Sequence, residues 1–155
     1  MDHVARALLP SLQAAARGFP AVLLTGPRRA GKTTLLRRAF PDADYRLLED
    51  PDVLSRVRQD PRGFLDELRP PAILDEIQNA PELLPYVRTR IDSRPARRGQ
   101  WLLTGSQEAP LMRGVTESMA GRAAVLELLP LSVAESSRVT PFRGGYPEVV
   151  ARPSG

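Results

Sequence analysis

Cysteine is absent from the 155 residues, and several other residue types are scarce. Without cysteine the chain has no disulfide, no thiolate metal site and no cysteine nucleophile. The one histidine, His3, stands alone near the amino terminus and has no assigned role. No apolar run approaches the ~18 residues that a membrane-spanning helix needs, so we expect no membrane partner. The length fits one domain that buries its own hydrophobic core.

Lysine is the scarcest charged residue type. Lysine and arginine together number 22, of which only Lys32 is lysine, against 18 acidic residues. The net charge of +4 and the isoelectric point of about 10.3 keep DNA open as a partner. The charges are mixed, without a run of five of one sign, which is more typical of an ordinary solvated surface.

The first 20 residues are rich in arginine and alanine. They include Asp2, lack serine enrichment and have no signal-type apolar stretch, which argues against a targeting segment. We interpret residues 1–20 as a lead-in, with an amphipathic helix over residues 3–17 and Pro10 as a possible kink. A cytoplasmic location is expected.

Short apolar runs alternate with helical patterns from residue 21 onward. Strands are predicted at residues 21–25, 45–48, 72–74, 101–104 and 123–128. Helices are predicted at residues 33–40, 52–68 with a break at Pro61, 81–91, 110–120 and 131–137. This alternation predicts an α/β fold with a five-stranded parallel sheet and helices on both faces, in three layers. Ligands of such sheets bind beyond the carboxyl ends of the strands.

The segment from Gly26 to Thr33 reads GPRRAGKT and matches the P-loop pattern G-x-x-x-x-G-K-[ST]. Its backbone N–H groups and the following helix N-terminus are suited to bind phosphates. Lys32 is expected to reach the β and γ phosphates, and Thr33 to ligate Mg²⁺. The alternative, a glycine turn with an incidental lysine, fits less well because this is the only lysine. The predicted nucleotide-contacting residues are Gly26, Pro27, Arg28, Arg29, Ala30, Gly31, Lys32, Thr33 and Thr34.

Two carboxylates end the predicted strand AILDE at residues 72–76. Asp75 is expected to hold Mg²⁺, directly or through water. Glu76 is expected to orient the attacking water or accept its proton. Alone, an apolar run that ends in Asp-Glu is a weak signal, but about forty residues after a P-loop it is a strong one.

Two further polar positions are weaker candidates. Ser106, in LLTGSQ, follows the fourth strand and could contact the γ phosphate or the water, with Gln107 as second choice; a plain turn residue is an equal alternative. Arg122 precedes the fifth strand and could act as an arginine finger, in its own chain or toward a neighbouring subunit. A surface position is the stronger interpretation for one arginine among 21. For Arg28 and Arg29 a solvated loop position is likewise an open alternative.

The sequence resembles the prokaryotic AAA-type ATPases whose full-length members carry a C-terminal domain of unknown function. The resemblance covers about residues 21–150. It rests on LLTGPRRAGKTTLL, AILDEIQNAPELLPYVR, LLTGSQ, ESMAGRAAVLELLPLSVAE and FRGGYPEV. It implies an AAA-like P-loop core with the first strand between the fourth and fifth, a sensor role for Ser106 and a nucleotide-interacting role for Arg122. It gives Gln78 no defined role.

From this we expect a core at residues 21–138 and, at 139–155, the start of a linker to a further domain. The predicted function is Mg²⁺-dependent ATP binding and hydrolysis, with Glu76, Lys32, Ser106 and Arg122 as catalytic residues and Thr33 and Asp75 as metal ligands. One alternative is a nucleotide-dependent switch, assembly or DNA-associated module with negligible turnover. Another is a small-molecule kinase, against which the Asp-Glu pair argues. ATP is the expected partner, with self-association through Arg122 as an option.

Overall fold

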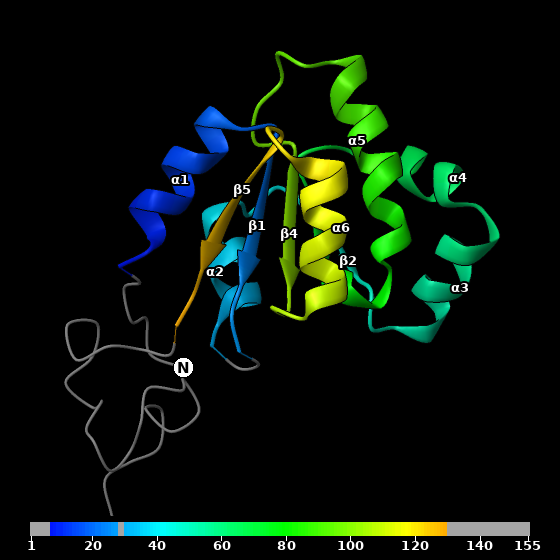
Figure 1. Ribbon diagram of the computed structural model, residues 1–155, viewed down its shortest axis with the longest axis horizontal. Helices are drawn as coiled ribbons and strands as arrows, with labels where there is room; N and C mark the ends of the chain where they lie inside the picture. The colour runs from blue at the N-terminus through cyan, green and yellow to red at the C-terminus, as the bar shows by residue number, and fades with distance from the viewer. Residues whose placement is uncertain (1–6, 28–29, 130–155) are drawn as a thin grey trace, which may run out of the picture.

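A single parallel sheet of five strands organises the protein. The structure is a computed structural model that describes residues 7–27 and 30–129. The strands are β1 (Ala21–Thr25), β2 (Asp44–Leu47), β3 (Ala72–Asp75), β4 (Trp101–Gly105) and β5 (Ala123–Glu127). Their order across the sheet is β2-β3-β4-β1-β5, and every neighbouring pair is parallel (Figure 1). The predicted sheet is therefore confirmed, including the position of β1 between β4 and β5.

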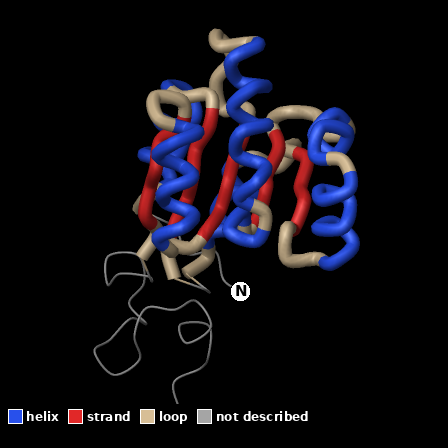
Figure 2. The backbone as a smooth tube through the Cα atoms, turned by 45° about the vertical axis from the view of Figure 1, so that its right-hand side comes forward, coloured by secondary structure: helices blue, strands red, loops and turns tan. Residues whose placement is uncertain are grey.

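Helices connect the strands and cover both faces of the sheet (Figure 2). They are α1 (Leu9–Gly18), α2 (Lys32–Ala39), α3 (Pro51–Gln59), α4 (Pro61–Asp66), α5 (Leu84–Ser93) and α6 (Ala109–Met119), with 3₁₀ turns η1 (Ile77–Asn79) and η2 (Pro81–Leu83). Because a parallel connection must return the chain to the same edge, every β-to-β crossover carries at least one of these helices.

Alternating strand residues divide the core into two layers. Along β1, Ala21 and Leu23 pack into one layer with residues of α3, α4, α5 and α6. Val22 and Leu24 pack into the other layer, with residues of α1 and α2. All five β1 residues are buried, as expected for a central strand that is covered on both faces. The carboxyl end of β1 is followed directly by the loop that leads into α2.

Two predicted helices differ from the observed ones. Helix α1 begins at Leu9 after a turn at residues 7–8, so Pro10 lies in the first turn and does not kink the helix. Proline is tolerated there because a first-turn N–H has no partner within the helix. The segment predicted as one helix over residues 81–91 starts with the separate turn η2 before α5. The helix predicted at 131–137 lies outside the described residues.

None of the helices within residues 7–27 and 30–129 combines the length and the apolar character needed to cross a membrane.

Candidate functional site

The loop between β1 and α2 turns sharply at two glycines. Gly26 has φ +148°, and a Cβ atom there would lie 2.2 Å from the backbone oxygen of Leu128. Gly31 has φ +97° and forms the N-cap of α2 in the left-handed region. Side chains at either position would be strained, and at Gly26 also obstructed by backbone. Arg28 and Arg29 lie outside the described residues.

Lys32 is the first residue of α2 and is buried. Its Nζ donates hydrogen bonds to the carbonyl oxygens of Gly26, at 2.7 Å, and Pro27, at 3.0 Å. The ammonium group is thus folded back over the loop, at the positive end of the α2 macrodipole. Thr34, in the same turn of α2, is exposed, and Ala30 is buried against the α1 and α2 side of the core. The loop therefore gathers positive potential at one point beyond the carboxyl end of β1.

The Asp75 carboxylate is the centre of a hydrogen-bond network that joins four elements. Asp75 ends β3 and is 3% exposed. The Thr33 hydroxyl on α2, 42 residues away in sequence, donates to it at 2.9 and 3.0 Å from the two carboxylate oxygens. The Thr104 hydroxyl on β4 and the Tyr45 hydroxyl on β2 donate to it as well, the latter at 2.5 Å. Three donors offset the cost of burying the charge, so the carboxylate is held at a defined position.

Tyr45 is a residue that sequence reasoning missed. Burial raises the pKa of its hydroxyl above the ordinary value, and the hydrogen bond to Asp75 raises it further. The guanidinium of Arg37 lies 4.5 Å from the centre of its ring. Only the pairing of β2 with β3 brings Tyr45 to Asp75, and that pairing cannot be inferred from a single tyrosine in a short strand.

Glu76 has an unusual backbone conformation for a residue that is not glycine. Its φ of +63° and ψ of +53° lie in the left-handed region, which other residues rarely adopt. Its N–H donates to the Thr104 hydroxyl at 2.9 Å, and its carboxylate accepts a hydrogen bond from the Gln78 side-chain amide. Such conformations cluster at functional sites, where neighbouring contacts maintain them.

Gln78 connects Glu76 to the segment after β4. Its Oε1 accepts a hydrogen bond from the Ser106 backbone N–H at 3.3 Å, while its amide nitrogen donates to Glu76. The Ser106 hydroxyl oxygen is shielded from solvent and has no hydrogen-bond partner within the part of the chain that the structure describes. Gln107 donates to the Thr25 hydroxyl at 3.4 Å. A buried hydroxyl without a partner at this place is suited to a bound ligand or water.

Of the six residues predicted as catalytic or metal-binding, the structure brings five to one edge of the sheet and leaves one elsewhere. Lys32, Thr33, Asp75, Glu76 and Ser106 all lie beyond the carboxyl ends of β1, β3 and β4. The sixth, Arg122, lies at the opposite edge of the sheet.

Arg122 precedes β5, and its backbone oxygen accepts a hydrogen bond from Ala21 at the start of β1. It therefore lies at the amino-terminal edge, about 16 Å from the loop, given roughly 3.3 Å for each residue of β1. Its guanidinium binds both oxygens of Asp92, at 2.7 and 3.1 Å. This pairing lowers the pKa of Asp92 and raises that of Arg122. Arg122 is therefore remote from the loop of its own chain, because β1 and β5 both run from this edge toward the loop.

Comparison with known proteins agrees with this architecture. Residues 18–137 match the family described as "AAA domain". The chain belongs to this AAA domain family. Two curated relatives are uncharacterized proteins of Mycobacterium tuberculosis and Mycobacterium bovis, each 36% identical over 143 residues. The match covers 88% of this chain and 32% of each relative, so the chain spans about a third of the length of these relatives.

Membership in the AAA domain family indicates a nucleotide-binding domain of the ATPase type. The P-loop geometry agrees with that general role. The sequence motifs located most of the polar residues at this edge, whereas Tyr45, Thr104 and the contacts of Gln78 became visible only from the packing of β2, β3 and β4.

Proposed function

We propose that this domain binds ATP together with Mg²⁺ and transfers the γ-phosphoryl group to water. The observation that carries the proposal is the contact between Thr33 and Asp75. A hydroxyl at the start of α2 and a carboxylate at the end of β3 meet at 2.9 Å beside the glycine loop. P-loop NTPases use a hydroxyl and a carboxylate of these origins to hold the metal ion of the nucleotide.

The donor set fits Mg²⁺. Thr33 and Asp75 offer a hydroxyl and carboxylate oxygens, which are the hard ligands that this ion prefers. Among residues 7–27 and 30–129 there is no group of three or more His, Cys, Asp or Glu side chains that could hold a metal ion. That suits an ion that keeps several of its waters and takes other ligands from phosphates. When bound, the ion would neutralise charge that develops on the phosphate oxygens.

Lys32 and the loop would hold the phosphates. The Lys32 ammonium group donates to the backbone oxygens of Gly26 and Pro27 at 2.7 and 3.0 Å. Phosphate oxygens are stronger acceptors because they are charged, so the ammonium group would exchange these carbonyls for them. The backbone N–H groups at the start of α2 would add further donors. Gly26, Pro27, Arg28, Arg29, Ala30, Gly31 and Thr34 remain predicted contacts of the nucleotide.

Glu76 would act on the attacking water. The water oxygen forms a bond to the γ phosphorus as the bond to the β–γ bridging oxygen breaks, ADP leaves, and the proton of the water passes to the Glu76 carboxylate. Gln78 would hold this carboxylate in position through its amide. The unpartnered hydroxyl of Ser106 would contact the γ phosphate or the water.

The position of Arg122 supports a second candidate function, a nucleotide-dependent switch with slow turnover. Its guanidinium is at the far edge and bound to Asp92, so this chain does not bring it to its own phosphates. If Arg122 acts at all in catalysis, it would do so in a neighbouring subunit, with self-association as the controlling step.

The first test is the thermal midpoint of unfolding with and without Mg²⁺·ATP. At a hundredfold excess over Kd, binding adds about 2.7 kcal/mol, or roughly 5 to 10 °C for a domain of this size. We expect this shift in the wild type and its loss in Lys32→Ala, while Arg113→Ala, which removes an exposed charge from α6, keeps it. No shift in a folded wild-type sample would overturn the proposal.

Phosphate release separates the candidate functions. Release from ATP without an added acceptor supports hydrolysis and excludes a small-molecule kinase. An ATP-dependent thermal shift without measurable release, even at high protein concentration, would favour the switch.

A further inference from the structure

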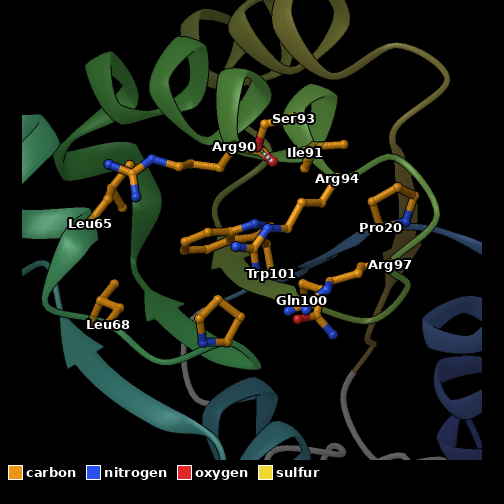
Figure 3. A pocket seen from close by; sticks show the side chains of 11 residues that line it. Pro20, Leu65, Leu68, Arg90, Ile91, Ser93, Arg94, Arg97, Gln100 and Trp101 are labelled. Carbon is orange, nitrogen blue, oxygen red and sulfur yellow. Dashed lines mark hydrogen bonds between the residues drawn. The ribbon is translucent and has the colours of Figure 1, made fainter.

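A cavity of about 260 Å³ lies at the amino-terminal edge of the sheet, opposite the glycine loop (Figure 3). It sits where β4 begins and where α4 and α5 end. Its apolar wall is formed by Leu65, Leu68, Ile91 and Trp101. Sites that enclose a whole drug-sized ligand measure roughly 300–1,000 Å³, so this cavity suits one part of a larger ligand. An apolar group of limited size is the part that such a wall would accept.

Arginines surround this apolar wall, and they differ in how they are paired. Arg90 forms an ion pair with Asp66 at 2.6 Å and donates to the backbone oxygen of Arg62. Arg94 and Arg97 also line the cavity, as Figure 3 shows, and their side chains make no ion pair or hydrogen bond within the described part of the chain. Two guanidinium groups at the edge of an apolar cavity, without carboxylates of their own, are suited to an anionic ligand.

The positive charge continues beyond the cavity. A second, more open hollow lies beside it and shares Gln100, and its lining includes Arg17 and Arg98. Within the described residues the Arg98 side chain makes one hydrogen bond, to the backbone oxygen of Pro95, and the Arg17 side chain makes no hydrogen bond or ion pair there. Four arginines therefore lie along one edge without acidic partners. A ligand that meets all of them must be extended and carry several negative charges.

We propose that this edge binds a single nucleic-acid strand, with phosphates on Arg17, Arg94, Arg97 and Arg98 and one unpaired base in the cavity at Trp101. An unpaired base combines a planar apolar body with polar edges, and the phosphates on either side of it supply the anionic charges. The Gln100 side chain lies at the boundary of the two hollows; its amide nitrogen donates to the Arg98 backbone oxygen at 2.9 Å, and its carbonyl oxygen would accept from the edge of the base. A duplex would fit less well because its bases are paired and stacked.

This site is independent of the proposed nucleotide site. Trp101 opens β4 and Thr104, which contacts Asp75, lies near its other end, so the length of the strand separates them. Trp101 is also the only tryptophan in the chain. Trp101 is 4% exposed and packs in the core beside the cavity, so its fluorescence reports on the cavity and on the core around it.

The test is titration of the full chain with a short oligothymidylate, followed by tryptophan fluorescence and, with a labelled strand, by anisotropy. We expect quenching that saturates together with the anisotropy. Four phosphate contacts predict a slope of log K against log salt of about −3, from roughly −0.7 for each contact on a single strand. Binding should persist in Lys32→Ala and in the presence of Mg²⁺·ATP.

The double variant Arg94→Ala/Arg97→Ala should weaken binding at least tenfold and reduce the magnitude of the salt slope by about 1.4. The matched control, Arg58→Ala/Arg113→Ala, removes the same charge from α3 and α6 and should change the affinity less than threefold. An equal loss of affinity in both double variants would show that binding depends on net charge alone, and would overturn the proposed site. Anisotropy without quenching, equal affinity for a duplex, or equal affinity for a polyglutamate peptide would each overturn the insertion of a base.

Discussion

The two edges of the same sheet differ in how their charged side chains are paired. At the carboxyl edge the Asp75 carboxylate is buried and accepts hydrogen bonds from three hydroxyl groups. At the amino-terminal edge Arg94 and Arg97 surround a cavity without any carboxylate partner among the described residues. A buried charge must be satisfied within the protein, whereas an exposed one can be satisfied by solvent or by a ligand. The arrangement at the carboxyl edge therefore supports the proposed chemistry, and the arrangement at the amino-terminal edge supports the proposed binding.

This comparison predicts that variants at the carboxyl edge change turnover and nucleotide binding, while variants at the other edge leave both unchanged. The largest effect is expected for Glu76→Gln, which keeps the shape of the side chain and removes its ability to accept a proton. Loss of a general base reduces turnover by about 10²- to 10⁴-fold. Phosphate release under saturating Mg²⁺·ATP measures this, with Glu82→Gln on η2 as control. Unchanged turnover in Glu76→Gln would show that Glu76 does not activate water.

The next largest effect is expected for Gly26→Ala, on stability. The added Cβ would lie 2.2 Å from a backbone oxygen of Leu128, at φ +148°. Backbone strain and overpacking together should lower the free energy of unfolding by about 2 kcal/mol or more. Urea denaturation measures the change. Gly18→Ala is the matched control, because a Cβ there meets no atom within 4 Å, and equal losses in the two variants would contradict the importance of the close approach.

Gln78→Met should have a smaller effect, confined to catalysis. The variant keeps the length of the side chain but removes the amide that holds the Glu76 carboxylate. We expect kcat to fall about tenfold, equivalent to ~1.4 kcal/mol, with KM unchanged. Steady-state kinetics with Gln107→Met for comparison would separate the two glutamines. A parallel rise in KM would indicate a structural role.

Tyr45→Phe should cost about 1 kcal/mol of stability at neutral pH, because one hydrogen bond to Asp75 is lost. The pKa of Tyr45 is raised in the folded state above its unfolded value of about 10. Its contribution is therefore fully present below pH 10 and is lost as the pH rises above that value. Urea midpoints of wild type and variant should converge in alkaline solution. A constant difference across the pH range would contradict the assigned hydrogen bond.

The smallest effect is expected for Arg122→Ala. Its ion pair with Asp92 joins a partly exposed and an exposed side chain, and solvent screens such surface pairs strongly. The thermal midpoint and its shift with Mg²⁺·ATP should both stay close to the wild-type values, as in Asp92→Ala. If Arg122 serves a neighbouring subunit, any rise of specific turnover with protein concentration would disappear in the variant. Loss of the ATP-dependent shift of the thermal midpoint in dilute solution would contradict the separation of Arg122 from the nucleotide site of its own chain.

Much of the fold could be predicted from sequence because its signals are local. Five short apolar runs alternate with helical patterns, and the P-loop spacing places Lys32 at the start of α2. The site could be predicted only in part. Asp75 ends β3 and Glu76 follows it, which is a local feature, but the hydroxyl groups that hold Asp75 come from residues between 29 and 42 positions away.

The place of Arg122 in the sheet could not be predicted from the motif alone. Its place before β5 follows from the sequence, but the edge at which that place lies depends on the direction of β5 beside β1. In a parallel sheet every strand ends at the loop edge, so the chain must cross back to the opposite edge before the next strand begins. A residue that precedes a strand is therefore remote from the loop that follows one.

The sequence by itself determined the element order, the glycine loop and the residues that end β1 and β3, because spacing and backbone preference act over a few residues. Tertiary structure alone decided that Tyr45 and Thr104 bind Asp75, that Gln78 joins Glu76 to the segment after β4, and that arginines surround Trp101 at the other edge. These contacts join residues that are distant in sequence, and only the strand order and the packing of helices on the sheet bring them together.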